Sequence, residues 1–268
     1  MNINIITIAT EDYIKYFKGF MESIHKFFPD QNKWVTLLTD YTGDFDDINS
    51  SVHFERKYIY PLIYPTVNVN KPIFLNEEIK EKSEKYDYVF IIDVDTIFIT
   101  AKHYIWESLK VKMDSGAILL NTHPFYRLND GARHWNIPKD ELIQNLYTAN
   151  LTEKDDRFSS YIPDGEYTYI NSSFWGGNTA EVKRFNDAII ELTRKDLTKY
   201  PYGYHIPRYM DENYVNYLYY CNEYLKDNTF KLEVGGYSVL YNTDSWENDS
   251  VFMYQKNMEE ITNKKNRR

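Results

Sequence analysis

The feature that most constrains the fold is a run of five apolar residues at 88–92, followed at once by Asp93-Val94-Asp95. A continuous apolar run of this length is typical of a central parallel strand that is covered on both faces. In open α/β sheets, ligands bind beyond the carboxyl ends of the strands. Two carboxylates at positions i and i+2 can hold a hard divalent cation there. The position of this acidic pair therefore favours a metal site, although the same short pattern also arises by chance.

Apolar runs alternate with helical patterns through the first half of the chain. Residues 3–8 and 34–38 are strand-like runs, and residues 13–28 between them carry apolar side chains at helical spacing and stop at Pro29. A further helix is expected over about 72–85, because proline is favoured at an early helical position. This alternation predicts an α/β protein with an open sheet.

The second half of the sequence is less regular. Residues 117–120 are expected to form a strand, and residues 181–194 and 211–221 are expected to form helices. The segment from about 127 to 160 shows no clear period, and we expect one helix in it near 139–146. Neither repeats nor Gly/Ser/Pro-rich linkers divide the chain, which favours a single domain.

Composition excludes several classes of function. A net charge of −9 argues against nucleic acid as the main partner. The single cysteine, Cys221, rules out an intrachain disulfide and disfavours a zinc–thiolate site. No apolar stretch has the length of a membrane span, and no signal peptide is recognised, so we expect a cytoplasmic protein without a transmembrane segment. The 26 tyrosines and 5 tryptophans suit sugar and uracil binding, with biased codon usage as the alternative explanation.

Two other motifs have ordinary structural explanations when taken alone. Asp211-Glu212 opens a predicted helix, where acidic residues favour the helix dipole. Phe174-Trp175-Gly176-Gly177 follows a strand-like segment, and its two glycines suggest a tight turn or a close approach of the backbone to a ligand.

A series of short motifs nevertheless follows one another in a defined order. They are Ala9 with Tyr13, residues 20–23 (FMES), Thr39-Asp40, residues 88–95 (YVFIIDVD), 123–126 (HPFY), 161–163 (YIP), 174–177 (FWGG), and Asp211-Glu212 with Asn216. In this order the motifs resemble those of glycosyltransferase family 6, which contains the histo-blood-group A and B transferases, the α-1,3-galactosyltransferase and shorter bacterial members.

The resemblance implies a GT-A fold, with a mostly parallel central sheet flanked by helices. It implies one catalytic domain over residues 1–268, with a nucleotide-binding half at about 1–122 and an acceptor-binding half at about 123–268. The implied reaction is the retaining transfer of galactose, or a related hexose, from a UDP-sugar to a glycan acceptor through an α-1,3 linkage. Mn²⁺ or a similar divalent cation is the implied cofactor.

The resemblance also assigns roles to individual residues. Glu212 falls on the family's catalytic glutamate, and would act as a nucleophile or as the anion that stabilises an oxocarbenium-like centre. Covalent and front-face mechanisms both remain open. Asp93 and Asp95 would hold the metal. The implied donor-binding residues are Ala9, Tyr13, Lys71, Asp93, Val94, Asp95, Asn171, Ser173, Asp211 and Lys256, and the implied acceptor-binding residues are His123, Trp175 and Tyr209. For Trp175, a place in the core is the alternative to a sugar contact.

The sequence departs from the family pattern beside the catalytic pair. Met210 replaces a histidine of the family. Ser172-Ser173 stands where the family has the small pair that distinguishes galactose from N-acetylgalactosamine. Because Ser173 is bulkier than glycine, we favour UDP-galactose over UDP-N-acetylgalactosamine as the donor.

The expected acceptor is an oligosaccharide or a lipid-linked glycan at the inner face of the membrane, in a bacterial or viral setting. Two alternatives remain. The first is a GT-A transferase of another retaining family that uses a different UDP-hexose. The second is a sugar- or nucleotide-binding protein without catalytic activity.

Overall fold

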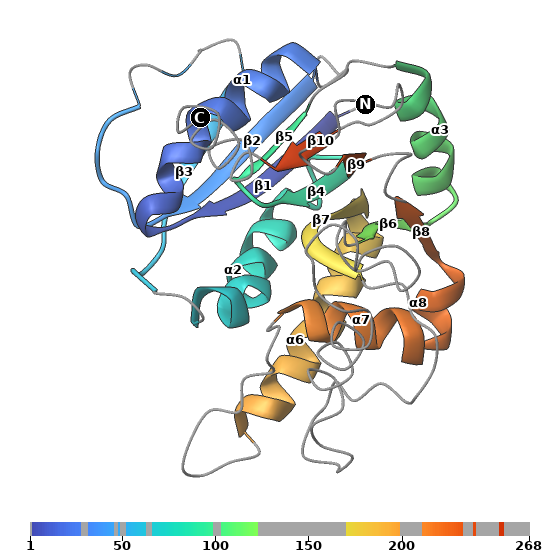
Figure 1. The fold of residues 1–268 in the computed structure, drawn as a ribbon. Coiled ribbons are helices and arrows are strands. Elements are labelled where there is room, and N and C mark those ends of the chain that lie inside the picture. Colours follow the sequence, from blue (N-terminus) through green and yellow to red (C-terminus); the bar gives the residue numbers. More distant parts are fainter. Residues whose placement is uncertain are drawn as a thin grey trace, which may run out of the picture.

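A computed structural model describes the fold (Figure 1). The described residues are 2–27, 32–45, 48, 52–62, 66–98, 103–122, 170–198, 211–232, 238–239 and 252–254.

The centre of the molecule is a seven-stranded sheet with the order β3-β2-β1-β4-β7-β6-β8. Its strands are β1 (Asn2–Ala9), β2 (Asn32–Thr39), β3 (His53–Tyr58), β4 (Tyr88–Ile92), β6 (Ile118–Thr122), β7 (Ile170–Asn178) and β8 (Thr229–Leu232). All pairs are parallel except those of β7, which lies antiparallel between β4 and β6. The prediction of an α/β protein with a mostly parallel sheet is confirmed, and the arrangement is consistent with a GT-A-like fold.

Helices cover both faces of this sheet (Figure 1). They are η1 (Glu11–Tyr16), α1 (Phe17–Phe27), α2 (Thr66–Lys82), α3 (His103–Asp114), α6 (Thr179–Thr198), α7 (Asp211–Cys221) and α8 (Glu223–Asp227). A second, small sheet joins β5 (Thr96–Phe98), β10 (Phe252–Tyr254) and β9 (Ser238–Val239). Among the described residues, no helix combines the length and the apolar character that crossing a membrane requires.

The apolar run of β4 is buried on both faces, as its sequence predicts. Phe90 and Ile92 belong to the core under α1 and α3, whereas Val89 and Ile91 face the core under α2, α6 and α7. Side chains of this size each contribute roughly 1.5–3 kcal/mol when they are fully buried. Burial on both sides therefore fixes β4 and the residues that follow it.

Helix α2 begins earlier than the sequence predicted. It starts at Thr66 instead of near Pro72, which lies inside the helix. A proline lacks the N–H that would bond to the carbonyl four residues back. Asn186 of α6 donates a hydrogen bond of 2.9 Å to the carbonyl of Pro72. This bond joins α2 to α6 at the position of the proline.

The glycine pair at 176–177 does not form the predicted turn. Residues 174–177 lie within β7, paired with β4 and β6. A Cβ atom on Gly176 would lie 2.7 Å from the carbonyl oxygen of Val89 in β4. The close backbone approach that the sequence suggested is therefore an approach to a neighbouring strand, and not to a ligand.

Strands from both expected halves of the chain join the one large sheet. The boundary near residue 122 stays a prediction. The irregular segment around 127–160, with its expected helix at 139–146, lies outside the described residues.

Candidate functional site

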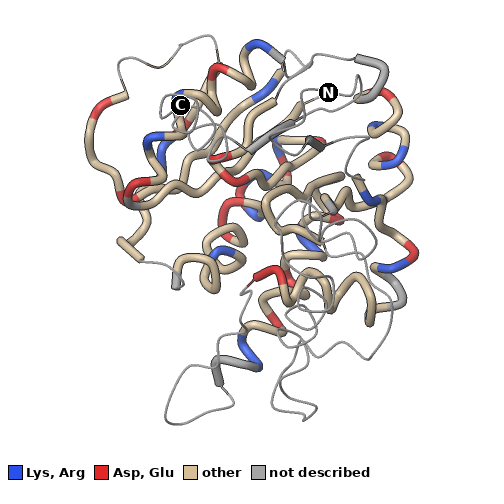
Figure 2. Tube along the Cα trace, in the orientation of Figure 1, with Lys and Arg blue, Asp and Glu red and all other residues tan. Residues whose placement is uncertain are grey.

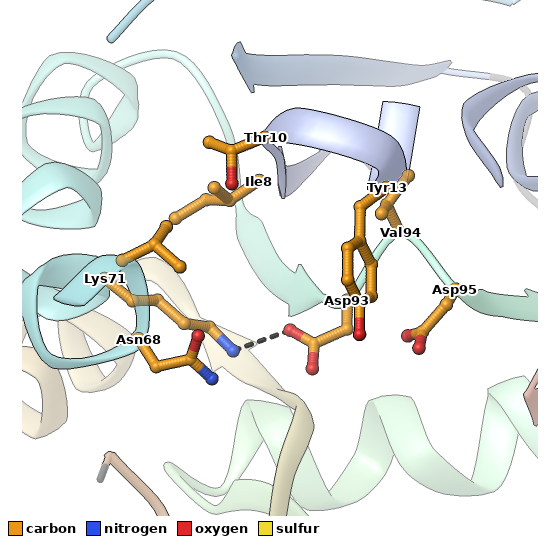
Figure 3. Close-up of a pocket in the computed structure, with 9 residues that line it drawn as sticks. Ile8, Thr10, Tyr13, Asn68, Lys71, Asp93, Val94 and Asp95 are labelled. Atoms are coloured by element: carbon orange, nitrogen blue, oxygen red, sulfur yellow. Dashed lines mark hydrogen bonds and ion pairs between the residues drawn. The ribbon is translucent and has the colours of Figure 1, made fainter. Parts of the chain in front are cut away.

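The candidate site is a pocket where β1 and β4 end. Three elements form its walls: the end of β1 with η1, the first half of α2, and the loop after β4 (Figure 3). Its volume is about 170 Å³. The lining residues are Ile8, Thr10, Tyr13, Val67, Asn68, Lys71, Asp93, Val94 and Asp95. The predicted position of the acidic pair beyond the carboxyl end of β4 is thus observed.

Lys71 joins this pocket to the start of α7. Its Nζ atom lies 2.6 Å from Oδ1 of Asp93, 3.5 Å from Oδ2 of Asp211 and 3.1 Å from the carbonyl oxygen of Ser172. The Lys71 side chain is only 8% exposed, and that of Asp211 is 6% exposed. Figure 3 shows the contact between Lys71 and Asp93. One ammonium group thereby connects α2, β4, β7 and α7.

Four carboxylates lie in or next to the pocket together with Lys71. These five described residues, the pocket cluster, are Lys71, Asp93, Asp95, Asp211 and Glu212, and their own formal charges sum to −3. Burial works to lower the pKa of Lys71, but the charges of Asp93 and Asp211 raise it above its usual value, so Lys71 is a cation. Burial, aided by the like charge of Asp93, raises the pKa of Asp211. A surplus of negative charge in a partly buried site favours the binding of a further cation.

A bulge in β7 brings its backbone into the site. Leu120 pairs with Trp175, whereas the next residue, Asn121, pairs with Asn171, so three residues of β7 (172–174) have no counterpart on β6. The N–H of Ser172 lies within 3.4 Å of Oε1 of Glu212, and its carbonyl accepts the bond from Lys71. Bulges next to sites of this kind redirect strand residues towards them.

Asn216 fastens the first turn of α7 to β7. Its side-chain oxygen accepts a hydrogen bond of 2.9 Å from the N–H of Ile170, and its amide nitrogen donates to the carbonyls of Ile170 and Glu212, both at 2.8 Å. Asn216 is buried, where hydrogen bonds of this kind are costly to lose. The side chain therefore holds Asp211 and Glu212 in place against the bulge.

Asp93 and Asp95 are the residues that could hold a metal. Oxygen ligands are those that Mg²⁺ and Mn²⁺ prefer. The Asp93 side chain remains 40% exposed despite its contact with Lys71, and Asp95 lines the same pocket. Within the described ranges, His, Cys, Asp and Glu side chains form no group of three or more that could ligate a metal. Two carboxylates leave other coordination positions of such a cation open to oxygen atoms of a bound ligand.

The other residues predicted to bind the donor differ in their exposure and in whether they line the pocket. Tyr13 lines the pocket and is 41% exposed, which leaves its ring accessible. The Ala9 side chain is fully buried, and its neighbours Ile8 and Thr10 line the pocket instead. Asn171 directly precedes the β7 bulge and Ser173 lies in it, and the Asn171 side chain accepts a 2.6 Å hydrogen bond from the N–H of Ser173.

The prediction that Trp175 contacts an acceptor is not supported by its position. Its side chain is 2% exposed and packs edge-on against Phe185 of α6 at 5.2 Å between ring centroids. Alternate side chains of β7 point to opposite faces of the sheet, and that of Trp175 lies on the face covered by α2, α6 and α7. His123, Tyr209 and Lys256 lie outside the described residues, and their roles stay predictions.

The small sheet brings a distant part of the chain to the acidic pair. β10 pairs antiparallel with β5, so Tyr254 lies opposite Thr96, the residue after Asp95. Lys256 follows Tyr254 by two positions in the sequence.

The sequence reasoning missed part of the lining, namely Ile8, Thr10, Val67 and Asn68. Asn68 had no usable signal, because the sequence predicted the helix only from about residue 72, and the helical spacing of Asn68 and Lys71 emerges only in the structure.

Comparison with known proteins adds one finding to this geometry. No protein-family model matches the sequence. The chain is 26% identical over 228 residues to the O-antigen biosynthesis glycosyltransferase WbnI of Escherichia coli, in an alignment that covers 83% of this chain and 84% of that protein. This similarity supports a glycosyltransferase. It implies a nucleotide-sugar donor and a glycan acceptor, and the pocket at the end of β4 is the candidate donor site.

Proposed function

We propose that the protein is a metal-dependent retaining glycosyltransferase, of the type of family 6, that transfers galactose from UDP-galactose to a glycan acceptor through an α-1,3 linkage. One observation carries the proposal: the acidic pair beyond β4 is joined through the buried Lys71 to Asp211, which lies next to Glu212. The similarity to WbnI over most of both chains supports the same class of enzyme.

The proposed donor lies across the pocket in an extended form. The exposed ring of Tyr13 stacks on uracil, because a flat aromatic face suits a planar base. Asp93 and Asp95 hold a divalent cation such as Mn²⁺, whose chemistry is to offset the negative charge that develops on the departing UDP. Lys256 contributes a second positive charge to the diphosphate. The sugar then extends towards the start of α7.

Glu212 is the proposed catalytic residue. Asn216 donates a hydrogen bond to the main-chain carbonyl of Glu212, and the N–H of Ser172 donates to its side chain, so both parts of the residue are oriented. Its carboxylate faces the anomeric carbon, either as the nucleophile of a covalent intermediate or as the anion that stabilises an oxocarbenium-like centre during front-face attack. Asp211, already bound to Lys71, accepts hydrogen bonds from the donor-sugar hydroxyls.

Donor choice is assigned to the β7 bulge. Ser172 and Ser173 are both buried there, so the space beside them is limited. A hydroxyl group at C2 of the sugar fits more easily than an N-acetyl group. UDP-galactose should therefore be used in preference to UDP-N-acetylgalactosamine, and comparable kcat/KM values for the two donors would contradict the assignment.

The proposed acceptor is a glycan of the O-antigen type, oligosaccharide or lipid-linked, because the similar protein acts in O-antigen biosynthesis by its name. His123 and Tyr209 are proposed to contact it. A lipid-linked acceptor would bring the enzyme to the inner face of the membrane.

The first experiment measures the release of UDP from a panel of UDP-sugars, with Mn²⁺ and with excess EDTA. We expect slow hydrolysis of UDP-galactose that stops in EDTA. Glu212→Gln should reduce turnover by roughly a thousandfold while UDP still binds. Glu191→Gln, on the exposed face of α6, is the matched control and should turn over normally. If Glu212→Gln retained full turnover with an acceptor, the proposed catalytic role would be wrong.

A further inference from the structure

The wall of the pocket formed by α2 presents two polar side chains, Lys71 and Asn68. A lysine ammonium has three N–H donors and no acceptor. Lys71 directs these donors at Asp93, Ser172 and Asp211, with N–O distances between 2.6 and 3.5 Å. A ligand could engage Lys71 only by displacing one of these contacts inside a buried site. The protein itself therefore uses the hydrogen-bonding capacity of Lys71.

Asn68 differs from Lys71 because its hydrogen-bonding groups are not used by the residues that the structure describes. It lies one helical turn before Lys71, lines the pocket and is half-buried. Figure 3 shows Asn68 and Lys71 on the same side of the pocket, both from α2. Within the described part of the chain, no hydrogen bond engages the Asn68 side chain. An amide offers two donors and two acceptor positions, which matches sugar hydroxyls that both donate and accept.

We propose that Asn68 is the residue of α2 that binds the hydroxyl groups of the donor sugar, whereas Lys71 is a positioning residue for Asp93 and Asp211. The proposal rests on the proposed function and deepens it. It also revises the sequence-based expectation that Lys71 contacts the donor. In this arrangement the lysine sets the geometry of the two carboxylates, and the neighbouring amide recognises the sugar.

The order of residues across the pocket indicates which part of the donor Asn68 meets. In Figure 3, Tyr13 and Asp95 lie on one side, Asp93 lies in the middle, and Lys71 and Asn68 lie on the other side. Uracil on Tyr13 and a diphosphate beside the acidic pair leave the sugar for the side of α2. The amide of Asn68 is therefore placed for the hexose and not for the base.

Asn68→Ala tests the proposal in the full chain. The dissociation constants for UDP and for UDP-galactose are measured by titration calorimetry with Mn²⁺ present. We expect UDP to bind as in the unchanged protein and UDP-galactose to bind about tenfold more weakly, as for the loss of one or two hydrogen bonds to a ligand. Asn76→Ala is the matched control, because Asn76 lies on the same helix outside the pocket lining, and both constants should stay unchanged.

Two outcomes would overturn the assignment of Asn68. An equal loss of affinity for UDP and UDP-galactose would place Asn68 against the nucleotide, and unchanged affinity for both would remove it from the site. Asn68→Asp keeps the size of the side chain but replaces its two donors by a charge, and it should again weaken UDP-galactose more than UDP. Failure of the unchanged protein to bind UDP with Mn²⁺ would instead contradict the proposed function itself, and the inference with it.

Discussion

The two ends of α2 carry lysine-centred charge clusters that differ in balance. Near its start is the pocket cluster around Lys71. Near its end is the edge cluster, which ties α2 to the outermost strand β3 and consists of Lys57, Lys82, Glu55, Glu78 and Glu81. Figure 2 shows the acidic and basic segments of the chain, including the acidic start of α7 near the middle of the molecule. The two clusters use the same chemistry for different purposes.

The edge cluster is nearly balanced. Its two lysines meet three glutamates, a summed formal charge of −1, and every glutamate contacts a lysine. The pocket cluster has one lysine for four carboxylates and is more deeply buried at Lys71 and Asp211. The comparison indicates that the edge cluster serves the fold, whereas the carboxylates of the pocket cluster suit a bound cation and its ligand.

The largest expected effect comes from removing the positive charge of Lys71 from the pocket cluster. Lys71→Met would leave Asp93 and Asp211 facing each other without their shared ammonium. Breaking a buried ion pair costs about 3–5 kcal/mol, and Asp93, the carboxylate proposed to bind the metal, would also lose its orientation. We expect a clear fall in Tm and at least a hundredfold loss of kcat/KM for UDP release.

A second variant separates charge from packing at Lys71. In Lys71→Met, the carboxylates of Asp93 and Asp211 lose their shared cation. Adding Asp211→Asn removes one of these two negative charges, so Tm should recover in part while turnover does not. Thermal denaturation and the UDP-release assay measure the two quantities. A Tm for Lys71→Met equal to that of the unchanged protein would mean that the pocket cluster contributes nothing to the fold.

A smaller effect is expected from the corresponding change in the edge cluster. Lys57 lies 2.9 Å from Glu78 and also contacts Glu55 and Glu81, but its side chain is 26% exposed. Partly solvated ion pairs contribute about 1 kcal/mol or less. Lys57→Met should therefore lower Tm slightly and leave UDP release unchanged. A large loss of turnover in this variant would contradict the assignment of the edge cluster to stability and of the pocket cluster to activity.

The smallest expected effect is in the edge cluster, where ionisation of two glutamates changes the stability of the fold in opposite directions. Burial acts to raise the pKa of Glu55, but its hydrogen bond and ion pair with Lys82 lower it overall, whereas burial raises the pKa of Glu78 above its usual value. A lowered pKa means stability that is present at neutral pH and lost as pH falls through the folded-state pKa. A raised pKa means that ionisation costs stability at neutral pH, and that this cost disappears on acidification.

Two substitutions measure that difference. Glu55→Gln should lower Tm at pH 7, and its difference from the unchanged protein should shrink below the usual glutamate pKa of about 4.3. Glu78→Gln should leave Tm at pH 7 equal or slightly higher, with the difference again closing at acid pH. Thermal melts between pH 3 and 8 report both variants, and the same sign for both at pH 7 would contradict the assignment of the raised pKa.

Features that depend on local sequence could be predicted well. The apolar run of β4 and the helix at Asp211–Cys221 lie where the patterns indicate. A continuous apolar stretch and a 3.6-residue period are properties of neighbouring residues, so they survive in the folded chain. The place of Asp93 and Asp95 beyond the end of β4 follows from the same run.

Features that distant residues decide could not be predicted. Helix α2 continues through Pro72, where Asn186 of the distant helix α6 contacts it, and the glycine pair of β7 reflects the closeness of Val89 in β4. The contacts of Lys71 with three other elements have no local pattern at all. Trp175 illustrates the same limit, because helices distant in the sequence pack on its face of the sheet and bury its side chain.

The place of β7 in the sheet has a consequence for how the chain acquires its structure. β4 and β6 leave the ribosome first, yet each completes its pairing only when residues 170–178 enter between them. Until then, both strands present open edges that can pair with other chains. Long-range insertions of this kind slow folding and prolong exposure of apolar surface. The nascent chain is therefore most vulnerable to aggregation after β6 has been synthesised and before β7 has paired with β4 and β6.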